Sequence, residues 1–227
     1  MLLTNNTDSF TGLKVLITAG PTREAIDPVR FISNHSTGKM GYALAEEFCD
    51  RGAVVTLISG PVNITSWNAA IRVVSVISAA QMYQACCEHF AESNITIFSA
   101  AVADYTPRFV AHQKIKKKDA AFSVELIKTV DIAAEMGKRK QPGQLMIGFA
   151  LETDNEIDNA IKKLYAKNLD LIVLNSLQDP GAGFGHDTNR ITLLGRNEMV
   201  KNFDLKDKKD VARDIIDSIT LPVFQNA

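Results

Sequence analysis

Polar and small residues gather in the stretch RFISNHSTGKMG at 30–41, which follows the apolar run at 13–18. The residues after it have helical periodicity, so the stretch would lie between a strand and a helix. There the unpaired N–H groups and the positive end of a helix can meet a phosphate. Gly38 and Gly41 would let the backbone approach a ligand closely, although a glycine pair at a helix start serves packing as often as binding. The stretch alone therefore indicates an anion site only weakly.

Two common nucleotide-binding loops can be tested against this stretch, and both fail. A Walker A loop needs Gly five residues before Gly-Lys and Ser or Thr after it, and Ser33 and Met40 occupy those places. The dinucleotide fingerprint GxGxxG is missing from ITAGPTREA, which follows the first strand. The excursion from Gly20 to Gly41 is nevertheless long, and long loops inside compact domains tend to be functional.

Other catalytic and metal-binding spacings are missing from the sequence. The histidines at 35, 89, 112 and 186 form neither HExxH nor HxxxH, and the three cysteines form no CxxC pair and no disulfide framework. A short-chain oxidoreductase needs a lysine four residues after a tyrosine, and those places hold Glu46, Cys87, Phe109 and Leu169. These observations argue against a zinc enzyme and against that class of oxidoreductase.

Apolar strand-like runs alternate with amphipathic segments along the chain. Strands are predicted at 13–18, 53–59, 71–77, 122–127, 145–150 and 169–175, and 94–105 is predicted as a strand that runs into a loop rich in small residues. Helices are predicted at 37–51, 79–93, 131–140, 154–168 and 204–219. This alternation predicts an α/β fold with a doubly wound, mostly parallel, Rossmann-like sheet in a single domain over 1–227. A small hairpin extension is predicted at 190–202, a loop at 20–36 and a glycine-rich segment without regular structure at 179–189.

Composition sets broad limits on partners and location. Among 227 residues, 25 basic and 26 acidic ones leave a net charge of −1, so we expect neither nucleic acid nor membrane as a partner. No run of 18 apolar residues occurs, and the first ten residues do not read as a signal peptide. We therefore expect a cytoplasmic protein.

Five stretches identify a family resemblance. ITAGPTREAIDPVRFISNHSTGKMG, SAAVADY, KIKKK, GFALET and KNLDLIVLN, in that order, resemble phosphopantothenoylcysteine synthetase, the ligase of coenzyme A biosynthesis, and the likeness runs from about Leu13 to Ile219. The resemblance implies that 4′-phosphopantothenate is activated with CTP and Mg²⁺ as an acyl-cytidylate. Cysteine then takes the acyl group and CMP leaves. In many bacteria this enzyme resembles the C-terminal half of a bifunctional protein whose N-terminal half is a flavin-dependent decarboxylase. The present sequence shows no likeness to that half, so the resemblance implies a stand-alone homodimeric form without flavin.

The resemblance also assigns roles to individual residues. Asn34 and Lys114 are the expected catalytic residues, with the Asn34 amide at the acyl oxygen and Lys114, first in KIKKK, at the triphosphate. The residues expected to bind the acyl substrate are Arg30, which would act across a dimer interface, with Asn34, Ala100, Ala101 and Asp104. The segment 106–121 would form a mobile flap over the ligand.

The expected nucleotide-binding residues lie all along the chain. They are Gly20, Ser36, Gly38, Gly41, Asp104, Lys114, Thr129, Asp131, Phe149, Lys163, Lys167 and Asn175. Simpler explanations exist for several of them: a solvated basic run at KIKKK, a turn asparagine at 34, a core phenylalanine at 149 and a solvated lysine pair on the helix at 154–168. Val130 stands where the bacterial pattern usually has proline, which weakens the assignment at 129–132.

The sequence leaves several points open. Metal ligands, cysteine-binding residues and the preference for CTP over ATP are undetermined. Two rival functions also remain, a non-catalytic nucleotide- or flavin-binding module and an NAD(P)-dependent oxidoreductase.

Overall fold

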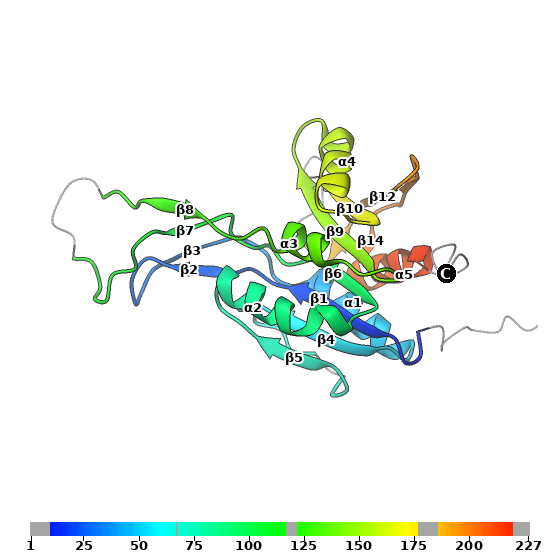
Figure 1. Ribbon diagram of the computed structural model, residues 1–227, viewed down its shortest axis with the longest axis horizontal. Coiled ribbons are helices and arrows are strands. Elements are labelled where there is room, and N and C mark those ends of the chain that lie inside the picture. The colour runs from blue at the N-terminus through cyan, green and yellow to red at the C-terminus, as the bar shows by residue number, and fades with distance from the viewer. Residues whose placement is uncertain (1–9, 67, 117–121, 177–185, 220–227) are drawn as a thin grey trace, which may run out of the picture.

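An eight-stranded sheet forms the centre of the computed structural model, which describes residues 10–66, 68–116, 122–176 and 186–219 (Figure 1). The strand order is β13-β12-β10-β9-β6-β1-β4-β5, in which the six strands from β10 to β5 are parallel. β12 pairs antiparallel with β10 and with β13. The strands are β1 (Lys14–Ala19), β4 (Val54–Ser59), β5 (Arg72–Ser75), β6 (Ile95–Phe98), β9 (Leu145–Glu152), β10 (Leu171–Ser176), β12 (Ile191–Gly195) and β13 (Val200–Asn202). The predicted mostly parallel sheet and its hairpin extension are confirmed.

Helices cover both faces of this sheet. α1 (Lys39–Asp50) and α5 (Lys208–Ile219) pack together on one face, and α2 (Ala79–His89), α3 (Ile132–Arg139) and α4 (Glu156–Ala166) lie on the other. Strand β1 explains why both faces need a cover, since its buried side chains alternate between two cores. Val15 and Ile17 pack with α1 and α5, whereas Leu16 packs with the opposite helices. The doubly wound arrangement is therefore confirmed.

The helix ends follow local chemistry, with one correction. Gly52 has φ +87° just after α1, a left-handed conformation that favours glycine and ends the helix. Ser78 caps α2 in a capping box with Gln81. The last helix begins at Lys208 and not at the predicted Asp204, because β14 (Lys206–Asp207) first pairs with β11 (Thr188–Asn189).

Two short ribbons extend away from the sheet and form what we call the arm, the described residues of 22–33 and 105–128 (Figure 1). One ribbon pairs β2 (Arg23–Ala25) with β3 (Phe31–Ser33), and the other pairs β7 (Tyr105–Pro107) with β8 (Leu126–Lys128). The predicted loop at 20–36 therefore contains a hairpin.

The predicted strand at 122–127 is wrong in its bounds and its burial. β8 covers 126–128, lies outside the main sheet and has all three residues exposed. The alternation in FSVELI carries a strand period but does not reveal which partner the strand takes.

Some sequence predictions fall outside the described residues. These are the end of the predicted flap at 117–121 and most of the glycine-rich segment, at 179–185. Among the helices of the described residues, none combines the length and the apolar character needed to cross a membrane.

Candidate functional site

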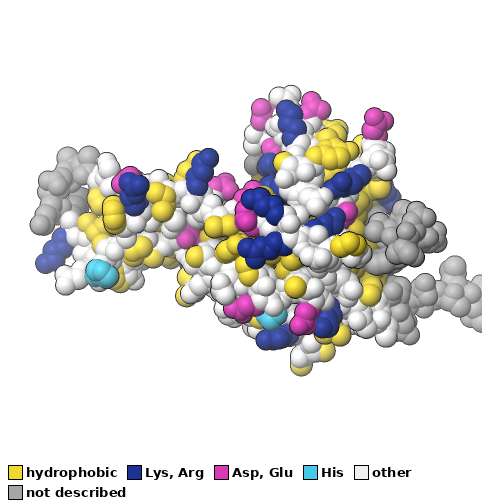
Figure 2. All heavy atoms as spheres, viewed as in Figure 1, with side chains coloured by type: hydrophobic (Ala, Val, Ile, Leu, Met, Phe, Trp, Pro, Cys, Tyr) yellow, Lys and Arg dark blue, Asp and Glu magenta, His cyan; other side chains and the backbone are white. Residues whose placement is uncertain are grey.

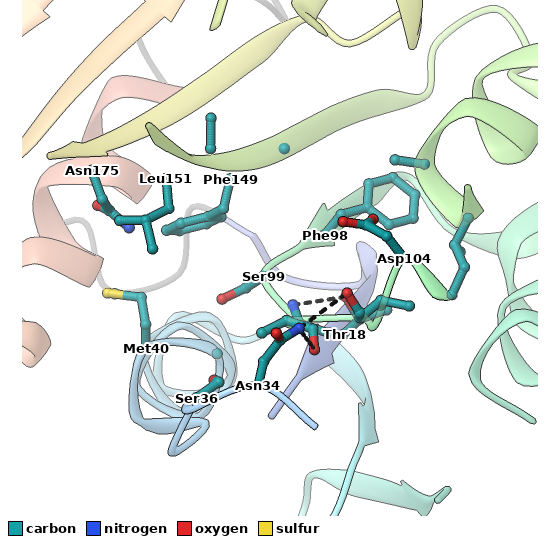
Figure 3. Close-up of a pocket in the computed structure, with 18 of the residues that line it drawn as sticks. Thr18, Asn34, Ser36, Met40, Phe98, Ser99, Asp104, Phe149, Leu151 and Asn175 are labelled. Atoms are coloured by element: carbon teal, nitrogen blue, oxygen red, sulfur yellow. Dashed lines mark hydrogen bonds between the residues drawn. The ribbon is translucent and has the colours of Figure 1, made fainter. Parts of the chain in front are cut away.

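A cavity of about 770 Å³ opens at the carboxyl ends of four parallel strands (Figure 3). Thr18 of β1, Phe98 of β6, Phe149 of β9 and Asn175 of β10 all line it. The chain reverses its direction of winding beside β1, whose neighbours are β4 on one side and β6 on the other. Open parallel sheets bind ligands at such a switch point.

The cavity brings together most of the residues that the sequence resemblance selected. The predicted residues that line it are Asn34, Ser36, Gly38, Gly41, Ala100, Ala101, Asp104, Thr129, Asp131, Phe149, Lys163, Lys167 and Asn175. Gly20, Arg30 and Lys114 are the predicted residues that do not line it.

The start of α1 forms one wall through glycine backbone. Gly38 precedes the helix with φ +79°, and its N–H donates to Ser36 Oγ at 3.3 Å. Gly20 lies behind it, because a Cβ on Gly38 would come within 3.4 Å of the Gly20 Cα. A Cβ on Gly41 would lie 2.5 Å from the Ala19 Cβ, so this glycine serves helix packing as well as lining the cavity.

Asn34 connects this wall to the loop after β6. Its Nδ2 donates to the carbonyls of Ala101 at 3.0 Å and Val102 at 3.2 Å, and the N–H of Ala100 donates to Thr18 Oγ1 at 3.2 Å (Figure 3). Both amide protons of Asn34 are thus directed at main-chain oxygens. Donation to an acyl oxygen stays a prediction, and it requires one of these bonds to be exchanged.

The segment before α3 supplies the opposite wall. Thr129 donates from Oγ1 to the Ala103 carbonyl at 2.6 Å and from its N–H to the Asp104 carbonyl at 2.9 Å. Asp131 caps α3 by accepting from the Ala134 N–H at 3.1 Å. Valine at position 130 therefore leaves both neighbouring residues on the cavity wall.

Lys163 of α4 and Lys167, directly after that helix, both line the cavity, and each forms an ion pair. Lys163 Nζ lies 2.5 Å from Glu152 Oε1, and Lys167 Nζ lies 3.0 Å from Asp131 Oδ2. Both lysines line the cavity, as their spacing of four residues predicts. Neither is a merely solvated surface cation.

The cavity wall also has chemically capable residues that were not predicted, among them Lys39, Lys208 and Asn189. Lys39 lies inside the stretch that first drew attention, directly after Gly38. Lys208 and Asn189 come from the end of the chain, and Asn189 is 2% exposed and donates to Asn175 Oδ1 at 3.0 Å. The antiparallel pairing of β11 with β14 places them there, and no motif in the sequence marks it.

The arm holds Arg30 and Lys114 outside the cavity of their own chain. Arg30 donates from Nε and Nη2 to Asp27 Oδ2, at 3.0 and 2.5 Å, and from Nη2 to the Ile115 carbonyl at 3.1 Å. The Arg30 guanidinium holds the pKa of Asp27 well below its usual range. Lys114 is exposed beside this cluster.

No group of three or more His, Cys, Asp or Glu side chains within 10–66, 68–116, 122–176 and 186–219 is arranged to hold a metal ion. The metal ligands that the sequence left open therefore stay undetermined.

Comparison with known proteins gives consistent matches. Residues 10–221 match the family described as the DNA/pantothenate metabolism flavoprotein C-terminal domain. The chain is 54% identical over 208 residues to a cysteine/cysteine sulfinic acid decarboxylase from an unknown prokaryotic organism. It is 49% identical over 208 residues to the coenzyme A biosynthesis bifunctional protein CoaBC of Bacillus subtilis. These alignments cover 92% of this chain but 58% and 51% of the two relatives.

A solved structure gives the same match. The crystal structure of the C-terminal domain of a CoaBC protein superposes with a TM-score of 0.79 at 40% identity. The superposition covers 93% of this chain and 96% of that domain.

Proposed function

The chain belongs to the DNA/pantothenate metabolism flavoprotein C-terminal domain family, and from this premise we propose that it is a phosphopantothenate–cysteine ligase of coenzyme A biosynthesis. The family resemblance identified from the five sequence motifs is thereby confirmed. The observation that carries the proposal is the cavity, because it gathers at the carboxyl ends of the parallel strands most of the residues that the resemblance assigns to nucleotide and acyl group.

The proposed reaction has two steps. A carboxylate is a poor acyl donor, because its charge repels nucleophiles and oxide is a poor leaving group. The carboxylate of 4′-phosphopantothenate therefore attacks the α-phosphorus of CTP, and pyrophosphate leaves. The amine of cysteine then attacks the acyl carbon of the acyl-cytidylate, and CMP leaves with the bonding electrons.

The cavity residues suit these steps in different ways. Glycine backbone at the start of α1 and the lysines of α4 offer donors and positive charge to phosphate groups. Asn34 stands at the junction of the two walls, where an amide can orient the acyl group and stabilise negative charge on its oxygen. Phe149 offers a ring face to the nucleotide.

Mg²⁺ fits this site as an ion that arrives with the nucleotide. Magnesium is usually bound by substrate phosphates with one or two carboxylates. Asp104 and Asp131 are the carboxylates on that wall. The ion would neutralise charge on the departing pyrophosphate.

A homodimer is part of the proposal, because the arm keeps Lys114 and Arg30 away from the cavity of their own chain. The arm exposes large apolar side chains, among them Phe31, Phe109, Phe122 and Leu126. Figure 2 shows such side chains along the arm. An arm of this kind suits contact with a second copy, whose cavity would then receive the two cations. We place the reaction in the cytoplasm, where small phosphorylated metabolites are held.

The test is an incubation of the purified protein with 4′-phosphopantothenate, Mg²⁺ and either CTP or ATP, with and without cysteine. We expect pyrophosphate release that depends on phosphopantothenate and does not require cysteine. CMP release and formation of phosphopantothenoylcysteine, followed by mass spectrometry, should require cysteine. Comparison of the two nucleotides gives the preference that residue types leave open.

Other results would identify a rival function. Nucleotide binding without pyrophosphate release would indicate a binding module, and reduction of NAD(P)⁺ would indicate an oxidoreductase. The decarboxylase name of one relative belongs to a protein of which the alignment covers 58%. A separate incubation with cysteine or cysteine sulfinic acid alone, in which carbon dioxide release is measured, tests that activity directly.

A further inference from the structure

Two lysines, Lys39 and Lys208, lie where the main cavity meets a second hollow of about 540 Å³ between α1 and α5. Both lysines line both spaces. Each is the first residue of its helix, and the two helices pack side by side on the same face of the sheet. The structure thus brings two cations, from distant parts of the chain, to one end of the cavity.

The contacts of Lys39 leave its charge accessible. Its Nζ lies 2.5 Å from Asp187 Oδ1, and the Asp187 side chain is 80% exposed. Lys39 holds the pKa of Asp187 below its usual value. An exposed carboxylate on a single lysine is a weakly held counter-ion, since solvent screens such a pair. A more highly charged anion entering from the cavity can displace it.

Lys208 is nearly buried, with 9% of its surface exposed, and its Nζ donates to the His186 carbonyl at 2.5 Å. Burial, with Lys39 nearby, lowers the pKa of this amine. Holding two ammonium groups near each other, one of them away from water, is unfavourable in the ligand-free protein. A bound anion would relieve that cost.

The position of the pair within the cavity indicates which anion fits. Gly38 immediately precedes Lys39, and the Asn175–Asn189 hydrogen bond lies on the same wall as Lys208. Lys163 also forms an ion pair, but its partner Glu152 is only 12% exposed, so that pair is less screened by solvent than the pair of Lys39 with Asp187. We propose that Lys39 and Lys208 bind the β- and γ-phosphates of the nucleotide and then the pyrophosphate that leaves.

This inference rests on the proposed ligase function and adds two residues to it. When the substrate carboxylate oxygen bonds to the α-phosphorus, the bond from that phosphorus to the bridging oxygen breaks. The electron pair stays with the bridging oxygen, and pyrophosphate carries the charge. Lys39 and Lys208 stabilise that charge as it develops, and Asp187 returns to Lys39 after the product departs.

The direct test measures binding of inorganic pyrophosphate to the full chain by isothermal titration calorimetry. Lys39→Gln should weaken pyrophosphate binding roughly tenfold or more, because a charge-assisted hydrogen bond is lost. Asp187→Asn should strengthen it, because the competing carboxylate is removed. Lys209→Gln is the matched control, since Lys209 lines the second hollow but not the main cavity.

A second readout separates ligand contact from general structure. CMP has no β- or γ-phosphate, so its affinity should be unchanged in Lys39→Gln, while the KM for CTP rises. Lys208→Gln should act in the same direction. If burial makes that variant unstable, Lys39→Gln and Asp187→Asn still decide the question.

Two results would overturn the proposal. One is pyrophosphate binding by Lys39→Gln as tight as that of the wild type, and the other is equal weakening by Lys209→Gln. Failure of the ligase function gives a different result, because the wild type would then release no pyrophosphate from CTP and phosphopantothenate. The calorimetric comparison would still report on the lysine pair.

Discussion

The cavity and the arm are built on opposite physical principles. The cavity lies at the end of a parallel sheet buried on both faces, so each wall is held by strands and helices with a shared core (Figure 3). The arm has two-stranded ribbons and exposes Phe31, Phe109 and Phe122, which a self-sufficient element would bury (Figure 1). The cavity walls are therefore held within one chain, whereas the apolar side chains of the arm have little cover of their own.

A buried carboxylate, and not an apolar core, orders the outer part of the arm. The Asp27 side chain has no exposed surface, and it accepts from the N–H groups of Val29 and Arg30, both at 2.8 Å. It also accepts from the Ile115 N–H at 3.1 Å, directly after Lys114. The two regions therefore differ in what holds them together: a shared core holds the cavity walls, and a buried carboxylate holds the segment that carries Lys114.

The largest expected effect comes from removing the charge that the arm carries. Lys114→Gln should lower kcat for pyrophosphate release by roughly 10²- to 10³-fold, the size expected when a group that stabilises transition-state charge is lost. Affinity for CMP should change little, because the cavity itself is intact. Steady-state kinetics and calorimetry on the same preparation check the two statements.

A mixed dimer tests whether the arm acts on the partner's cavity. A dimer of one Lys114→Gln chain and one Asn34→Ala chain, isolated through two different tags, would contain one cavity with both residues intact. We expect it to keep about half of the wild-type turnover. Inactivity of the mixed dimer would mean that Lys114 of each arm acts in the cavity of its own chain, which would contradict the proposed action across the dimer.

The apolar surface of the arm gives the next largest effect. Phe109 is 78% exposed, so Phe109→Asp should not destabilise the chain itself. It should raise the dissociation constant of the dimer roughly 10- to 100-fold, because a charge is placed in an apolar contact. Sedimentation equilibrium measures this change.

Ile157→Asp is the control for that substitution, because Ile157 is an exposed apolar residue on α4, away from the arm. It should leave the dissociation constant unchanged. Equal dissociation in both variants would place the interface elsewhere.

The sequence predicted secondary structure correctly where burial of one face gives apolar residues a regular spacing. The run at 13–18 and the segment at 154–168 were correctly predicted as β1 and α4, because a buried strand and an amphipathic helix have distinct apolar patterns. The cavity residues were collected by resemblance, and the sheet explains why they meet. Lys208 was missed because the β11–β14 pairing that places it spans only two residues in each strand.

For the arm, the sequence predicted a strand but could not predict its exposure. The period-two pattern at 122–127 predicted a strand but not its exposed, two-stranded setting. A segment whose partner is another molecule has apolar residues like those of a core strand. Only the fold reveals that Phe122 stays 57% exposed, with the Arg30 guanidinium over its ring at 5.7 Å from the centroid.

A further prediction concerns acid loosening of the arm. The pKa of Asp27 is lowered from an ordinary value of 3.8, mainly by the hydrogen bond from Arg30, so its charged form is favoured by folding. The stabilising effect is complete above about pH 4 and is lost as pH falls below 3.8 toward the depressed value. Hydrogen exchange at the Ile115 amide, corrected for intrinsic rates, should lose protection roughly tenfold over that acid range.

Asp27→Asn sharpens this test, because it keeps the shape of the side chain and removes its charge. The variant should have low Ile115 protection at neutral pH and no further loss in acid. The Leu145 amide, which donates to the Asn94 carbonyl at 2.8 Å, is the internal reference, because it lies in the body, meaning the described residues outside the arm. Parallel loss at Leu145 would mean that the whole fold opens and that Asp27 does not act on the arm alone.

The smallest expected effect lies in the cavity. Phe149 is partly buried and packs against the core shared with α1 and α5, so a core role alone would also explain it. Phe149→Leu keeps an apolar side chain there and removes the ring face. CTP affinity should fall about 2- to 10-fold, the range expected for one aromatic contact. The dimer dissociation constant should be unchanged, because the residue belongs to the body. A changed dimer dissociation constant with unchanged CTP affinity would mean that Phe149 supports the dimer and does not contact the nucleotide.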